Sequence, residues 1–365
     1  MYKKSWLIAV VCFVFIFNSI VAQDLKPGFN KAEYIQLLEV SSRYSDSIYL
    51  KGIPAPETYK RIYLSPEMGL DNRWSLWMEN AQTAVICLRG TTQKSESWLA
   101  NFYAAMVPAK GSLHISDSFI FNYDLAPDPK AAVHTGWLLG TAFLARDILP
   151  KMDSLYKSGT RNFIITGHSQ GGAISFLMTA YLYSLQQQGK LPADIHFKTY
   201  CSAAPKPGNV YFAYHYETLT QNGWSYNIIN SADWVPQLPF SVQTLYDLNA
   251  TNPFVNSRQL IRKQGFPKSL LLRHIYNRIS KPAFHTQKNY EKYLGKYATK
   301  MVQKFIPGFE QPVFYGSSDY ARTGSTIVLQ ADPAYYKKFP DNPKTVFVHH
   351  SFQAYLYLAE KLKEK

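Results

Sequence analysis

The chain has 365 residues, of which 46% are hydrophobic, and it carries a formal net charge of +14. This length and apolar content exclude a disordered chain and allow one large domain. A positive charge of this size is typical of proteins that bind nucleic acid or anionic membranes. The sequence contains no nucleic-acid-binding motif, so we expect no nucleic-acid partner. Most of the excess is concentrated in residues 241–345, which hold 16 Lys and Arg against 6 Asp and Glu.

The N-terminus predicts an export signal. A basic start precedes a 12-residue apolar run over residues 6–17, and a short segment then leads to Ala22. A membrane span needs about 18 or more apolar residues, so the run is too short for an anchor. We predict a signal peptide at residues 1–22 and an exported protein, whether secreted, periplasmic or on the cell surface. Cys12 lies inside the apolar run and is not expected to carry a lipid.

Residues 23–365 predict a single α/β domain. Short apolar runs predict strands over 74–78, 84–88, 162–166, 195–201 and 226–230. Apolar residues at helical spacing predict helices over 136–156, with a kink at Pro150, and over 171–188. Helices that alternate with buried strands imply a mostly parallel central sheet with helices on both faces.

The two cysteines that follow the signal peptide, Cys87 and Cys201, lie at or near the ends of predicted strands. Although export compartments permit disulfides, such positions are typical of buried structural thiols, and we expect two free thiols rather than a bridge. The histidines are scattered without ligand spacing, so we expect no metal and no cofactor.

Ser169 is the candidate nucleophile, in the run Gly167-His168-Ser169-Gln170-Gly171-Gly172 between a predicted strand and a predicted helix. A serine hydroxyl attacks only when it is exposed on a tight turn beside a base and hydrogen-bond donors. Glycines at both flanking positions avoid collisions on such a strand-to-helix elbow. The N-terminus of the following helix directs its dipole at an anionic intermediate. A plain glycine-rich turn is the alternative, and His168 is expected to be a packed neighbour.

The candidate acid is expected downstream of Ser169. Along the chain, the residues of an α/β-hydrolase triad occur in the order serine, carboxylate, histidine. Asp233 follows the predicted strand 226–230 directly, so its side chain can reach a histidine over the C-terminal edge of the sheet. Asp247 and Asp319 lack a clear strand ahead of them.

For the base, the position in the chain favours His349 and His350. They lie in a turn between an expected strand end at residues 347–348 and an expected closing helix over 351–362. His274 and His285 lie among Lys and Arg, where a solvated surface role is the default. Position alone leaves the choice between His349 and His350 open.

Several separated segments resemble the class 3 lipase family, the α/β-hydrolase lipases and esterases typified by filamentous-fungal triacylglycerol lipases. These segments are Cys87-Leu88-Arg89-Gly90-Thr91, His134-Thr135-Gly136-Trp137, and residues 166–173, 204–209, 230–239 and 350–356. The resemblance covers about residues 74–239 and the last twenty or so residues.

The resemblance implies ester hydrolysis by the triad Ser169, Asp233 and His350, and it favours His350 over His349. The resemblance also implies that Thr91 and the backbone N–H of Gln170 form the oxyanion hole. Gln170 departs from the usual leucine, and the hundred-odd residues between the acid and the base exceed what a compact fungal-type enzyme needs. A phospholipase, a feruloyl-type esterase and a non-catalytic binding protein are the alternatives.

Two segments bear on the substrate. Residues 92–132 carry aromatic and apolar side chains between Gly, Ser and Pro, which is typical of a mobile lid, with ordinary core as the equal alternative. These side chains are Trp98, Phe102, Tyr103, Met106, Val107, Phe119, Phe121 and Tyr123. The basic insertion 241–345 is expected to be largely helical and to form a cap or an interfacial helix. We hypothesise that it rests the protein on anionic lipid; a solvated basic face is the other interpretation.

Overall fold

The computed structural model describes residues 25–44 and 52–363. The predicted signal peptide, with Cys12, lies outside these residues. Within the described part of the chain, no helix is long and apolar enough to cross a membrane.

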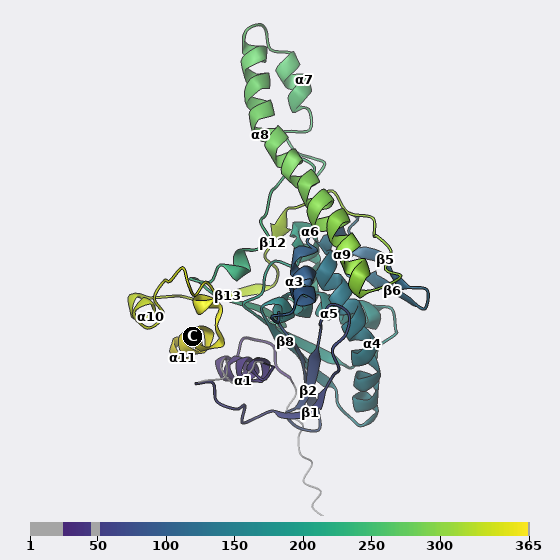
Figure 1. Ribbon diagram of the computed structural model, residues 1–365, viewed down its shortest axis with the longest axis vertical. Coiled ribbons are helices and arrows are strands. Elements are labelled where there is room, and N and C mark those ends of the chain that lie inside the picture. Colours follow the sequence, from purple (N-terminus) through teal and green to yellow (C-terminus); the bar gives the residue numbers. More distant parts are fainter. Residues whose placement is uncertain (1–24, 45–51, 364–365) are drawn as a thin grey trace, which may run out of the picture.

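A seven-stranded sheet in the order β1-β2-β3-β8-β9-β11-β13 forms the centre of the molecule (Figure 1). Strands β3, β8, β9, β11 and β13 are parallel, and β2 and β1 extend the β3 edge in antiparallel pairs. Every residue of β3 and β8 is buried, as expected for parallel strands covered on both faces. The strands are β1 Lys60–Leu64, β2 Trp74–Met78, β3 Thr83–Leu88, β8 Asn162–His168, β9 His196–Ser202, β11 Ser225–Asn230 and β13 Ser325–Leu329.

Helices cover both faces of this sheet, so the predicted mostly parallel α/β fold is confirmed. Alternate residues of β3 serve the two sides: Val85 packs in the cluster that holds α1 and α11, while Ile86 packs in the cluster that holds α4 and α5. The α-helices are α1 Lys31–Ser42, α3 Ser95–Phe102, α4 Thr135–Lys157, α5 Gln170–Gln187, α6 Val210–Leu219, α7 Ser257–Arg262, α8 Lys268–Glu291, α9 Ala298–Phe305, α10 Pro333–Lys338 and α11 Phe352–Lys361.

Smaller elements complete the fold. A four-stranded sheet has the order β12-β10-β7-β4, and β5 pairs with β6 in a separate hairpin. A π-helical turn, η2, joins α8 to α9. The remaining elements are β4 Met106–Pro108, β5 Lys110–Ser116, β6 Phe119–Asp124, β7 Ala132–His134, β10 Gly208–Asn209, β12 Tyr320–Ala321, η1 Val235–Gln237, η2 Lys292–Tyr297 and η3 Val348–His350.

The expected strand end at residues 347–348 is wrong. The chain there forms the 3₁₀ turn η3, and the hydroxyl of Ser351 then accepts a hydrogen bond from the N–H of Ala354 as the cap of α11. The last strand of the sheet is β13, which lies parallel to β11. Because β13 is an edge strand with several exposed side chains, it lacks the continuous apolar run that marked the buried strands.

The cysteine prediction is confirmed. Cys87 and Cys201 are free and buried, and burial raises the pKa of both thiols, Cys87 to about 12. Both thiols therefore serve as core side chains rather than as reactive groups.

Candidate active site

Ser169 stands on a tight turn between β8 and α5. Its backbone has φ 62° and ψ −129°, a conformation that a residue with a side chain adopts only when its surroundings hold it there. A Cβ on Gly167 would lie 2.4 Å from the carbonyl carbon of Gly171, and a Cβ on Gly171 would lie 2.1 Å from the carbonyl oxygen of Leu88. The turn therefore requires glycine at both flanking positions.

Asp233 and His350 meet at the C-terminal edge of the sheet. His350 Nδ1 lies 2.7 Å from Asp233 Oδ2, and the two side chains are 11% and 0% exposed. The carboxylate also accepts hydrogen bonds from the Tyr355 hydroxyl at 2.8 Å and from the N–H of Val235 at 3.0 Å. Burial alone would raise the pKa of Asp233, but the charge and hydrogen bond of His350, helped by the other two donors, hold it below its usual value. A carboxylate that stays ionised can orient the imidazole and stabilise its charged form.

His168 connects the turn of Ser169 to His350. Its Nε2 lies 2.9 Å from the backbone oxygen of His350 and must donate the hydrogen bond, since a carbonyl only accepts. Its Nδ1 then accepts from the Ser202 hydroxyl at 3.1 Å. Burial and the charge of His350 lower the pKa of His168 to about 3, so its ring is neutral near pH 7. The rings of His168 and His350 lie 4.9 Å apart. Among the described residues, His350 forms a side-chain hydrogen bond with Asp233 and none with Ser169 Oγ.

The other candidates for the acid and the base have different partners. His349 is turned away from Asp233, with Nδ1 2.8 Å from the Tyr335 hydroxyl and Nε2 2.9 Å from Asp341 Oδ1. The two alternative carboxylates accept hydrogen bonds from nearby hydroxyl and amide groups of the insertion, and the two alternative histidines are exposed on α8. These residues are Asp247, Asp319, His274 and His285.

The loop after β3 brings Thr91 beside the N-terminus of α5. Thr91 Oγ1 lies 3.4 Å from Gln170 Oε1 and accepts a hydrogen bond from Asn101 Nδ2 at 2.9 Å. The loop also approaches the nucleophile closely, because a Cβ on Gly90 would lie 3.5 Å from the Cβ of Ser169. Thr91 and Gln170 are therefore side by side next to Ser169, with the Thr91 hydroxyl donating to the Gln170 side chain.

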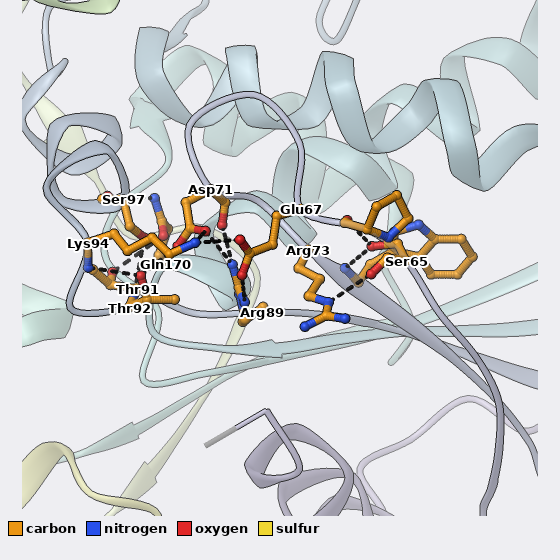
Figure 2. A network of polar contacts seen from close by, with 12 residues as sticks. Ser65, Glu67, Asp71, Arg73, Arg89, Thr91, Thr92, Lys94, Ser97 and Gln170 are labelled. Atoms are coloured by element: carbon orange, nitrogen blue, oxygen red, sulfur yellow. Dashed lines mark hydrogen bonds and ion pairs between the residues drawn. The ribbon is translucent and has the colours of Figure 1, made fainter. Parts of the chain in front are cut away.

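Figure 2 shows a network of ion pairs around this loop, which sequence reasoning missed. The carboxylate of Asp71 is 1% exposed and lies 2.9 Å from Arg89 Nη2 and 3.0 Å from Lys94 Nζ. It also accepts a hydrogen bond of 2.5 Å from the Thr92 hydroxyl. Glu67 contacts the same two cations. The network thus fixes both ends of the loop that carries Thr91. The available signal was Arg89 itself, a cation directly after a buried strand, which needs a carboxylate partner.

Aromatic side chains gather at the surface around Phe347, which lies next to His350. The ring of Phe347 lies 6.0 Å from that of His350, 5.3 Å from Trp234 and 6.2 Å from Trp98. Trp98 and Phe102 are exposed on α3, whereas five of the eight side chains noted between residues 92 and 132 are buried in the core. These five are Tyr103, Met106, Val107, Phe121 and Tyr123. Only the α3 part of that segment therefore presents apolar groups beside the site.

Part of the chain matches a known protein family. Residues 85–243 match the family model described as Lipase (class 3). Over 108 residues the chain is 32% identical to the secreted mono- and diacylglycerol lipase 1 of Fusarium solani, and the match covers 29% of each protein. The matched part is thus less than a third of that relative's length.

Solved structures of fungal lipases are also similar. The lipase of Rhizopus microsporus var. chinensis is 23% identical, with 57% of this chain and 69% of that chain covered and a TM-score of 0.40. The Rhizomucor miehei lipase in complex with its propeptide is 20% identical, with 59% and 66% covered and a TM-score of 0.41.

Proposed function

From the match of residues 85–243 to the class 3 lipase family model, we propose that the chain hydrolyses carboxylic esters of lipids with Ser169 as the nucleophile. The observation that carries the proposal is the pair of His350 and Asp233, held beside the strained turn of Ser169. Because His168 ties that turn to the backbone of His350, the three groups belong to one connected structure.

In the proposed reaction, His350 takes the proton of the Ser169 hydroxyl as Oγ bonds to the ester carbonyl carbon. The negative charge that develops on the carbonyl oxygen is met by the Thr91 hydroxyl and the N–H of Gln170, each contributing about 3 kcal/mol in comparable sites. The bond to the alcohol breaks, and His350 returns the proton to the alcohol oxygen. Water then attacks the acyl-enzyme by the same route and releases the carboxylic acid, while Asp233 orients the imidazole throughout.

Replacement of the nucleophile tests this proposal. Ser169→Ala is expected to lower kcat for a p-nitrophenyl ester by at least about 10⁴-fold and to abolish labelling by a fluorophosphonate probe. Ser118→Ala, in the turn between β5 and β6, removes a hydroxyl far from the site in sequence and serves as the matched control. Full hydrolysis by the Ser169→Ala protein would refute the assignment, and a wild type that the probe fails to label would favour a binding protein.

Export and contact with a lipid surface are further parts of the proposal. The pattern of residues 1–22 supports export, as does the similarity to a secreted fungal lipase. The exposed aromatic side chains of α3 support contact with a lipid–water interface, and the charge of the insertion 241–345 supports a preference for anionic lipid. Recovery of the protein outside the producing cell with Gln23 as its first residue is the expected result; retention inside with Met1 would contradict export.

A further inference from the structure

Helix α7 and the first half of α8 stand away from the body of the molecule (Figure 1). Residues 247–283 are referred to here as the helical hairpin. Its two ends meet where the rings of Tyr246 and Phe284 pack with centroids 4.9 Å apart. Helix α7 has no buried residue, and the first buried residue of α8 is Ser280. The outer part of the hairpin therefore contributes nothing to the protein core.

After Asp247, the hairpin and the rest of α8 up to residue 290 carry charge of a single sign. Residues 248–290 contain eight Lys and Arg and no Asp or Glu, so they supply more than half of the net charge of +14. Within the described part of the chain, none of these eight cations forms an ion pair with a carboxylate. The nearest acidic residue after them in the chain, Glu291, pairs instead with Lys296. The hairpin is thus left with uncompensated positive charge.

Large apolar side chains are exposed on the same hairpin. Phe266, in the turn between the two helices, is 87% exposed. Leu271, Ile275 and Ile279 recur every fourth residue along α8 and form one exposed stripe, in which Ile279 is 73% exposed. Apolar groups gathered in this way on a surface mark a contact with a partner rather than a solvated face.

We propose that the helical hairpin docks the protein on an anionic lipid bilayer. The cations meet the phosphate headgroups, and Phe266 with Leu270 and Leu271 enters the boundary between headgroups and acyl chains. A nucleic acid would satisfy the charge but leave the apolar turn uncovered. A second copy of the hairpin would place seven cations against seven. A bilayer supplies both the anionic and the apolar layer in the order in which the hairpin presents them.

The direction of the hairpin fits this role. In Figure 1 it rises from the end of the molecule that holds β12 and α3 and points away from β1 and β2. Helix α3 carries the exposed Trp98 and Phe102 beside the candidate site. Docking itself does not depend on the chemistry at Ser169. Cleavage of lipids in the same membrane by the docked protein rests on the proposed function.

Flotation with vesicles tests the docking. The full chain carrying Ser169→Ala, which cannot hydrolyse the vesicles in the proposed reaction, is mixed with phosphatidylglycerol or with phosphatidylcholine vesicles. We expect binding to phosphatidylglycerol at least about tenfold tighter than to phosphatidylcholine, and weakened by added salt. Equal binding to the two vesicles, or binding that is insensitive to salt, would overturn the proposal.

Two hairpin variants and one control identify the surface. Replacing Arg262, Lys263, Lys268 and Arg273 by Gln is expected to weaken binding to phosphatidylglycerol by at least about tenfold. A second variant, with Phe266, Leu270 and Leu271 replaced by Ser, is expected to weaken it similarly. The control replaces four exposed cations outside the hairpin, Lys60, Arg61, Lys157 and Lys190, by Gln and should bind as the parent does.

The outcomes separate docking from catalysis. In a background with Ser169 intact, all three variants should hydrolyse a soluble p-nitrophenyl ester at the parental rate. The replaced residues are all outside the protein core, and none of them belongs to the candidate active site. Loss of vesicle binding in the control, or its retention in both hairpin variants, contradicts the proposal. Parental protein that dimerises through the hairpin or binds DNA while ignoring both vesicles also contradicts it. A hairpin that docks on a protein inactive toward esters would refute the proposed function alone.

Discussion

Buried imidazoles link the stability of this protein to pH. Burial lowers the pKa of His134 to about 3, and burial with the charge of His350 lowers that of His168 to about 3. An unfolded histidine titrates near pH 6.5, so between roughly pH 3 and 6.5 the unfolded chain binds more protons than the folded one. Glu39 acts in the opposite direction, because burial raises its pKa to about 7 and the folded state then holds the extra proton.

Substitution of His168 measures its share of this linkage. As the pH falls from 6.5 toward 3, the free energy of unfolding should decrease by up to about 1.4 kcal/mol per pH unit for each buried histidine. His168→Asn is expected to remove one such contribution, seen as a shallower slope in urea unfolding between pH 6.5 and 4. His114→Asn, which removes an exposed histidine of β5, is the control. An unchanged slope in His168→Asn would show that this ring is charged in the fold.

At the scale of elements, the loop between β3 and α3 depends on a carboxylate far from it in sequence. Asp71→Asn keeps the shape of the side chain but removes the charge that Arg89 and Lys94 share. Because Arg89 is nearly buried, we expect the free energy of unfolding to fall by about 1–3 kcal/mol. Since the loop carries Thr91, kcat for a soluble ester should fall by about tenfold or more, with KM little changed.

Glu67 provides the matched comparison, because it contacts the same cations but is 40% exposed. Glu67→Gln is expected to cost at most about 1 kcal/mol and to leave kcat near the parental value. Equal effects of Asp71→Asn and Glu67→Gln on kcat would show that the buried carboxylate does not position the loop.

Local patterns in the sequence were sufficient to predict the turn that carries Ser169. They were not sufficient to predict the ion pairs that hold the neighbouring loop. The turn is encoded within five residues, which include Gly167, Ser169 and Gly171. The partnership of Asp71 with Arg89 depends on a turn in which Asp71 itself has φ 59°, and no periodicity reports such a contact. Strand β13 was missed for a related reason: an edge strand buries only part of its surface and lacks the apolar run of a central strand.

The choice between His349 and His350 shows the same limit at the site. Both lie in the predicted turn before α11, and position alone does not separate them. The 3₁₀ turn η3 directs His349 toward Tyr335 and Asp341 and leaves His350 facing Asp233. The family motif favoured His350 beforehand, but the direction of each ring is a tertiary property.

The whole molecule combines a densely packed body with an appendage that has little packing of its own. Helix α7 has six residues and no buried side chain, and isolated helices shorter than about 12 residues are marginal in water. We expect amide hydrogens of α7 and of residues 268–279 to exchange with solvent much faster than those of β8. Hydrogen exchange followed by mass spectrometry measures the difference.

The same measurement with vesicles completes this prediction. Phosphatidylglycerol vesicles should slow exchange in the helical hairpin and leave β8 unchanged, because ordering on the bilayer is confined to the docked helices. A hairpin as protected as β8 in the free protein would mean that it has packing partners beyond those described.

The contact of Tyr246 with Phe284 closes the base of the helical hairpin, so the chain leaves the body and returns to it at nearly the same point. A segment with adjoining ends can be shortened, lengthened or exchanged without moving the elements that flank it, since loop-closure entropy changes slowly with length. Asp233 and His350 lie on either side of this segment in the chain yet meet through the body alone. The helical hairpin, and with it the surface to which the protein binds, can therefore be changed by evolution or by engineering. Such a change leaves Asp233 and His350 in place.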